Sequence, residues 1–165
     1  MTMQLIETVT VGSAGVASIA FENIPQTGTD LILKYSLRIS SASISDSNSL
    51  KINGNDSNQY SRELRLNSST GASSSNGISV SIIVNADNSS PDTFGSGDIY
   101  ISNYATGSPV KPISIDQVTE NKGSTSSLRF TAGAYNSTNA VTSLAFVFGG
   151  KTILENSTAS IYMIS

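Results

Sequence analysis

The chain has 165 residues, of which 38% are hydrophobic and only 13% are charged, and its formal net charge is −3. Serine, threonine and asparagine together fill 61 positions, so the polar surface consists of hydroxyl and amide groups more than of ions. This length suits one domain with a core of its own, and it is short for two domains.

The residue types that are missing exclude several classes of function. The sequence contains no histidine and no cysteine, which removes cysteine nucleophiles, serine–histidine pairs, disulfides and ordinary zinc sites. No apolar run approaches the roughly 18 residues of a membrane span, and residues 1–7 lack the features of a secretory signal. The nine lysines and arginines are too few to form a nucleic-acid surface. We therefore expect neither a membrane nor a nucleic acid as partner.

Apolar and polar residues alternate with period two along most of the chain, and no long window shows helical spacing. Asp30–Ile39 is the clearest case, because five apolar side chains share one face while Lys34 and Arg38 share the other. Clusters of glycine, proline and asparagine separate such segments. The predicted strands lie near residues 3–11, 16–22, 30–39, 49–53, 60–66, 78–84, 97–102, 111–119, 127–135, 142–149 and 157–164.

Short strands at this spacing are typical of an all-β fold. They predict a single antiparallel β-sandwich domain over residues 1–165, jelly-roll-like, with about ten strands and no helix longer than about two turns. The apolar faces of the clearest strands supply the predicted core, which consists of Leu31, Leu33, Tyr35, Leu37, Val80, Ile82, Leu128, Phe130, Leu144 and Phe146.

Two segments, residues 40–49 and 67–77, are rich in serine and lack a clear apolar face. We interpret both as flexible surface loops. The alternative is that one of them becomes ordered against a partner.

Acidic and amide side chains gather at residues 46–48 and 53–56, and such oxygen ligands are those that calcium prefers. The spacing matches no EF-hand loop, so ordinary turn chemistry is the favoured interpretation. A pair of carboxylates could hydrolyse glycosides, but the acids are scattered singly. Asp98 and Asp116 occupy polar-face positions of predicted strands, which favours a role as solvated side chains. We assign no catalytic, cofactor-binding or metal-ligating residue, and we expect no cofactor and no enzymatic activity.

Exposed tyrosines could form the aromatic platform of a carbohydrate site, although packing is their more ordinary role. The candidates are Tyr100, Tyr104, Tyr135 and Tyr162.

Five ordered sequence motifs give more specific information about the protein's family than the composition does. They are IPQTGTDLIL at 24–33, LKINGND at 50–56 followed by Tyr60-Ser61, IYISNYA at 99–105, VTEN at 118–121 and STASIYMI at 157–164. Over nearly the whole chain these motifs resemble a family of small structural proteins encoded by tailed bacteriophages, especially phages of marine bacteria and cyanobacteria.

The resemblance implies a β-sandwich component of the virion, either a head decoration protein or an appendage near the tail, with no catalytic residues to carry over. The leading hypothesis is a capsid decoration protein that binds between capsid subunits and stabilises the head. The implied partners are the major capsid protein or other virion proteins, and a homotrimer is plausible. The alternative is a tail or tail-fibre module that binds host carbohydrate.

Two segments with few charges, Thr142–Gly149 and Ser157–Ile164, are candidate partner-facing strands, because an open sheet edge invites pairing with another chain. The alternative is that both are interior strands of one sandwich.

Overall fold

The computed structural model describes residues 2–67, 71–77, 79–105, 107, 110–122 and 125–165, with the backbone alone for residues 71–76. Within these residues the chain forms strands and no helix. The strands are β1 (Met3–Thr10), β2 (Ser18–Phe21), β3 (Asp30–Ile39), β4 (Ser45–Ser49), β5 (Lys51–Ile52), β6 (Gln59–Asn67), β7 (Gly71–Gly77), β8 (Ser81–Ala86), β9 (Gly95–Ile101), β10 (Lys111–Glu120), β11 (Ser126–Tyr135), β12 (Leu144–Val147) and β13 (Thr158–Ile164).

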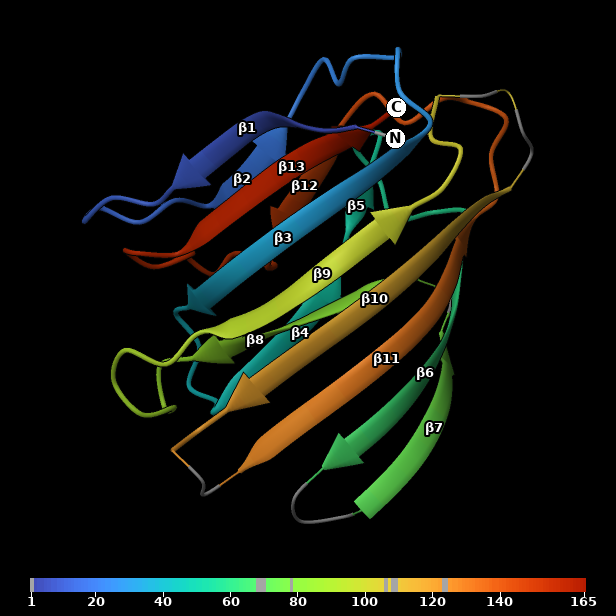
Figure 1. Ribbon diagram of the computed structural model, residues 1–165. Coiled ribbons are helices and arrows are strands. Elements are labelled where there is room, and N and C mark those ends of the chain that lie inside the picture. Colours follow the sequence, from blue (N-terminus) through green and yellow to red (C-terminus); the bar gives the residue numbers. More distant parts are fainter. Residues whose placement is uncertain (1, 68–70, 78, 106, 108–109, 123–124) are drawn as a thin grey trace.

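A long antiparallel sheet forms the front layer in Figure 1. Its strands follow the order β1-β13-β3-β9-β10-β11-β6-β7, and each pairs antiparallel with the next. The two chain ends lie side by side because Met3 of β1 is opposite Ile164 of β13. The strands next to each other in this sheet are mostly distant in the sequence, so long-range pairing determines the fold.

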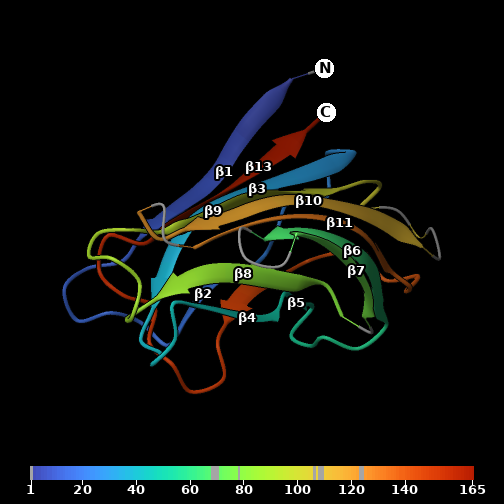
Figure 2. The same ribbon diagram turned by 90° about the horizontal axis from the view of Figure 1, so that it is seen from below.

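The back layer consists of two smaller groups of strands. Strands β2, β12 and β5 form a three-stranded sheet in that order, and β4 pairs antiparallel with β8. Strand β8 also makes a short parallel pairing with the end of β3, where Arg38 is opposite Asn85. Figure 2 shows these strands lying beneath the long sheet. The predicted all-β sandwich is therefore confirmed.

The core lies between the two layers. In β3 the alternation predicted from the sequence is realised, because every second residue from Leu31 to Ile39 is buried. Phe146 of β12 meets Tyr35 of β3 with ring centroids 5.4 Å apart, so the two layers contact through aromatic packing. The confirmed members of the predicted core are Leu31, Leu33, Tyr35, Leu37, Val80, Ile82, Leu144 and Phe146.

The prediction was wrong for the two core candidates of β11. Phe130 is 42% exposed and Leu128 is only partly buried, because both side chains point away from the back layer. Ser127 and Thr131 occupy the inward-facing positions of the same strand. The alternation itself was identified correctly, but the polar face of this strand is the one that faces inward.

The prediction of two serine-rich loops was also wrong in part. Residues 45–49 form β4, which pairs with β8, and residues 71–77 form β7, which pairs with β6. Backbone hydrogen bonds between strands do not require apolar side chains, so a serine-rich segment can pair without showing an apolar face. Residues 68–70 and 78, which also fall in predicted segments, lie outside the described residues.

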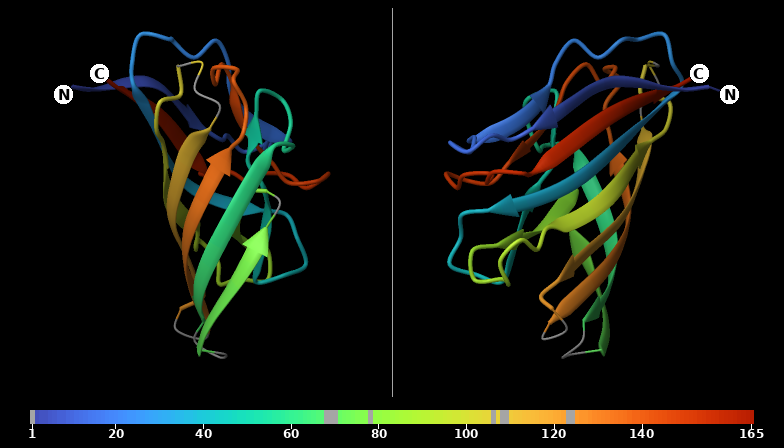
Figure 3. Two further views of the ribbon diagram at one scale, coloured as in Figure 1. Left: turned by 90° about the vertical axis from the view of Figure 1, so that its right-hand side faces the viewer. Right: turned by 60° about the vertical axis from the view of Figure 1, so that its left-hand side comes forward.

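The two segments proposed as partner-facing strands are interior strands, as their alternative interpretation required. Strand β13 lies between β1 and β3, and β12 lies between β2 and β5. In the described part of the long sheet, the edges are β1 and β7, which lie at opposite ends of the sheet (Figure 3).

Candidate functional site

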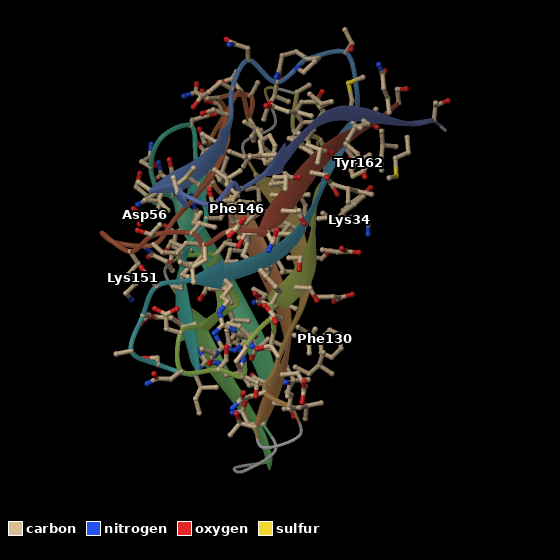
Figure 4. The ribbon with its side chains drawn as sticks, turned by 90° about the vertical axis from the view of Figure 1, so that its left-hand side faces the viewer. Lys34, Asp56, Phe130, Phe146, Lys151 and Tyr162 are labelled. Carbon is tan, nitrogen blue, oxygen red and sulfur yellow. The ribbon has the colours of Figure 1, made fainter. Side chains whose placement is uncertain are left out.

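The outer face of β6, β10 and β11 carries a cluster of apolar side chains that face away from the back layer. We name it the outer apolar patch, and it consists of Leu64, Leu66, Val118, Leu128 and Phe130. The strand register makes the patch continuous, because Leu128 is opposite both Leu66 and Val118 and Phe130 is opposite Leu64. Figure 4 shows Phe130 projecting from the sheet, whereas Phe146 lies between the layers.

The inward face of the same strands explains why these apolar side chains point outward. Along each strand, the residues that alternate with the patch point toward the back layer. They are Glu63, Gln117, Arg129 and Thr131. A shift of the register by one residue would exchange the two faces. The sequence therefore places polar groups inside and apolar groups outside at this end of the sheet, which is the reverse of the usual arrangement.

One buried polar side chain joins the two layers. The Oε1 atom of Gln117 accepts a hydrogen bond from the Ile83 N–H at 2.8 Å and lies 2.9 Å from the Tyr35 hydroxyl, which donates to it. Its Nε2 atom donates to the Ser81 carbonyl at 3.0 Å. Burial, above all, raises the pKa of Tyr35, so this hydroxyl stays protonated and available as a donor. The inward polar face is thus a hydrogen-bonded contact with β8.

Further along the same face lies an ionic cluster formed by Glu63, Arg65 and Arg129. Arg65 donates from Nε to the Glu63 carboxylate, and Arg129 Nη1 lies 3.5 Å from Glu63 Oε1. The Glu63 side chain is 5% exposed and that of Arg129 is 13% exposed. Burial is the largest influence on Arg129 and lowers its pKa, although the Glu63 charge opposes this effect.

A polar cavity of about 240 Å³ adjoins this cluster, between the end of the long sheet and the β4–β8 pair. Its walls include Ser45, Asn85, Thr119, Thr125, Ser127 and Arg129. Within the described residues, Asn85 Oδ1 and Thr125 Oγ1 have no hydrogen-bond partner. Buried polar atoms usually have one. Among the described residues Thr131 Oγ1 also lacks a partner, so two of these three atoms belong to residues of the cavity wall.

The structure brings together Asp98 and Asp116, the two acids for which the sequence analysis predicts solvated positions. Asp98 and Asp116 are directly opposite each other on β9 and β10, beside a hollow of about 250 Å³. Both are exposed on the outer face, and Lys34 Nζ lies 2.5 Å from Asp98 Oδ2. Catalysis by a pair of carboxyl groups needs different surroundings for the two, so that one acts as the acid and the other as the base. The exposed positions of Asp98 and Asp116 do not provide that difference.

The segments considered for calcium make turn and ion-pair contacts. Asp46 pairs with Lys151, and Asp56 Oδ2 lies 2.7 Å from Lys51 Nζ. Asn53 adopts a positive φ of 51°, and its Oδ1 accepts a hydrogen bond from a backbone N–H of the chain preceding β12. No group of three or more acidic residues able to hold a metal ion occurs among the residues that the structure describes.

The four tyrosines considered for a carbohydrate platform do not all share a surface, but Tyr100 and Tyr162 lie on the outer face of the long sheet, each opposite Ile32. Tyr104 and Tyr135 are buried, which corrects their assignment as exposed candidates. Tyr100 and Tyr162 remain partly exposed, and the Tyr100 hydroxyl donates to Asp30 Oδ2 at 2.7 Å. That hydrogen bond is the main cause of the raised pKa of Tyr100.

A different tyrosine, which the sequence analysis names only within a resemblance motif and not as a carbohydrate candidate, lines a hollow. Tyr60 is exposed beside Asp56 and Asn58, and with neighbouring polar residues it borders a hollow of about 520 Å³. A signal is present in the sequence, because asparagine and aspartate side chains at residues 53–58 precede Tyr60, but such a run is equally typical of an ordinary turn.

No family model matches this chain, and the searches of curated proteins and of solved structures likewise gave no match. Among the described residues there is no helix long and apolar enough to cross a membrane.

Proposed function

We propose that this chain is a structural protein of a tailed-bacteriophage particle that decorates the capsid and acts by binding alone. The observation that carries the proposal is the outer apolar patch. The phage assignment comes from the sequence motifs.

The patch supports a binding role because its exposure is specified by the sequence. Phe130 and Leu64 stay in solvent while Glu63 and Arg129 are inside, although a register shift by one residue would bury the apolar set. Contiguous apolar surface on a folded protein marks interaction sites. We infer that this face is covered in the assembled particle.

Decoration would stabilise the capsid through mass action. A protein that binds only the assembled lattice shifts the equilibrium toward that lattice. Repetition of the contact over many equivalent positions multiplies a modest interface through avidity. The low charge of the chain makes such a contact weakly sensitive to salt, because few ion pairs are available to be screened.

The direct test combines location with a variant of the patch. Immunogold labelling and quantitative gels of purified particles should place the protein on the head at a copy number comparable to that of the shell subunit. Purified protein added to capsids that lack it should raise their melting temperature. The double variant Leu64→Ser/Phe130→Ser should lose this effect.

Leu5→Ser is the matched control, because Leu5 is similarly exposed but lies on β1, at the far edge of the same sheet. It should behave as the unchanged protein does. Light scattering of the pure protein shows whether it also forms a small oligomer such as a trimer. A strict monomer that neither binds capsids nor shifts their melting contradicts the proposal, and so does loss of binding in Leu5→Ser with full binding in the double variant.

A tail module that binds host carbohydrate is the alternative, and the hollow beside Tyr60 favours it. An exposed aromatic ring next to carboxylate and amide side chains can stack on a sugar and bind its hydroxyl groups. Labelling at the tail with a low copy number, and loss of binding to host cells in Tyr60→Ala, would favour this alternative.

A further inference from the structure

The ionic cluster on the inward face carries a net positive charge, and its members differ in burial, since Glu63 and Arg129 are mostly buried whereas the Arg65 side chain is 37% exposed. Glu63 contributes one negative charge, whereas Arg65 and Arg129 contribute two positive charges. Burying an ion is costly unless an opposite charge compensates it. Since Arg65 already pairs with Glu63, the surplus positive charge lies at Arg129, the more buried of the two arginines.

The hydrogen-bonding groups of Arg129 are also incompletely used. A guanidinium has five N–H donors in a planar fork. Within the described residues its side chain has two polar contacts, both long: Nη1 to Glu63 Oε1 at 3.5 Å and Nε to Ser127 Oγ at 3.4 Å. Most of the fork is therefore available to another acceptor.

The cavity beside Arg129 offers space and further polar groups. It measures about 240 Å³, and hydroxyl and amide side chains form much of its wall. Asn85 is 1% exposed, and its Oδ1 lacks a hydrogen-bond partner within the described residues, as does Thr125 Oγ1. Glu120 borders the cavity too, but the alternation of β10 places its side chain on the exposed outer face.

We propose that this cavity binds a small molecule that bears a carboxylate, with the Arg129 guanidinium as its anchor. The planar fork of arginine matches the two oxygens of a carboxylate, which would also neutralise the surplus charge. The carboxylate can belong to a simple organic acid or to an acidic sugar, and the hydroxyl and amide wall suits an acidic sugar. The inference does not depend on capsid decoration, because it concerns the opposite face of β11.

The test is isothermal titration calorimetry of the full chain with D-glucuronate, acetate and D-glucose. Glucuronate carries both the carboxylate and the ring hydroxyls, acetate carries the carboxylate alone, and glucose carries the hydroxyls alone. We expect glucuronate to bind and glucose not to bind. Acetate binding as tightly as glucuronate identifies a general carboxylate site, and glucuronate binding alone identifies an acidic-sugar site. Both results support the proposal.

Two variants should move the affinity in opposite directions. Arg129→Gln removes the anchor and should weaken glucuronate binding about tenfold or more, as expected for loss of a hydrogen bond to a charged group. Glu63→Gln keeps the shape of the side chain but removes the competing carboxylate, so it should tighten binding about threefold or more. Arg62→Gln, on the exposed outer side of β6, is the matched control and should bind unchanged.

Thermal melting of each variant shows whether it folds. If Arg129→Gln does not fold, Arg129→Lys replaces it, since lysine keeps the charge but loses the fork, and it should bind more weakly than the unchanged protein. The proposal is overturned if neither carboxylate binds, if glucose binds as well as glucuronate, if the Arg129 variant binds normally, or if Glu63→Gln weakens binding.

Discussion

Phe130 of β11 lies directly opposite Leu64 of β6, and the two side chains are 42% and 47% exposed. On the other face of the same two strands, Thr131 lies opposite Glu63, and both are buried. At this end of the sheet the apolar side chains therefore lie outside and the polar side chains lie inside. We therefore expect substitutions on the outer face to affect folding less than substitutions on the inner face.

The two phenylalanines should therefore differ in their contribution to stability. Phe146→Ala should lower the free energy of unfolding by about 3–5 kcal/mol, because the ring is 1% exposed and its removal leaves a cavity. Phe130→Ala is the matched comparison and should change it by about 0.5 kcal/mol or less, as is usual at the surface. Urea denaturation followed by tyrosine fluorescence measures both values. Equal losses for the two variants would contradict the orientation of β11.

Gly97 should not tolerate a side chain. It lies between Tyr35 and Gln117 in the strand register, and a Cβ atom there would come within 2.7 Å of both the Asp116 carbonyl oxygen and the Tyr35 hydroxyl. Gly97→Ala should destabilise the fold by about 1–3 kcal/mol, the usual cost of overpacking. Gly12→Ala is the control, because a Cβ there meets no atom within 4 Å, and its unfolding midpoint should stay almost unchanged. If the unfolding midpoint of Gly97→Ala equalled that of the unchanged protein, the close packing of the Tyr35 ring against Gly97 would be contradicted.

Asp46 should contribute to the acid sensitivity of the protein. Burial acts to raise its pKa, but hydrogen bonds from Lys151, Ser41 and the Ser47 N–H outweigh burial and hold the pKa below its ordinary value of 3.8. A carboxyl with a lowered pKa in the folded state stabilises the fold above the unfolded-state pKa, and this contribution is lost as the pH falls through the folded-state value.

The stability difference between the unchanged protein and Asp46→Asn should accordingly be largest at neutral pH and shrink below about pH 4. Chemical denaturation at a series of pH values from neutral to acid measures it. Asp92→Asn removes an exposed carboxylate elsewhere and serves as the control. A difference that grows as the pH falls would refute the assigned role of the Lys151 pair.

The isolated protein should hydrolyse no polysaccharide, because the opposed carboxylates Asp98 and Asp116 are exposed and Asp98 is paired with Lys34. The measurement is the release of reducing sugar from bacterial surface polysaccharides over prolonged incubation. Asp98→Asn and Asp116→Asn are the diagnostic variants. Reproducible release that either substitution abolishes would establish an active site on the outer face and overturn this expectation.

Local pattern sufficed to identify most of the strands and the all-β class. Period-two alternation depends only on neighbouring residues along a strand, and it located β3, β10, β11 and β13 with nearly their observed bounds. It also predicted the buried faces of β3 and β12 correctly, because the apolar side chains of those strands face the other layer.

Tertiary structure alone decided which face of β6 and β11 points inward. Alternation defines two faces of a strand, but the layer that covers one of them is set by long-range pairing, and here the covered face holds Glu63 and Arg129. The strands β4 and β7 could not be predicted for a related reason. They are serine-rich and pair through backbone hydrogen bonds, which do not depend on side-chain polarity. The cavity beside Arg129 likewise exists only because β4 and β8 meet the consecutive strands β10 and β11, which are distant from them in sequence, at one end of the sandwich.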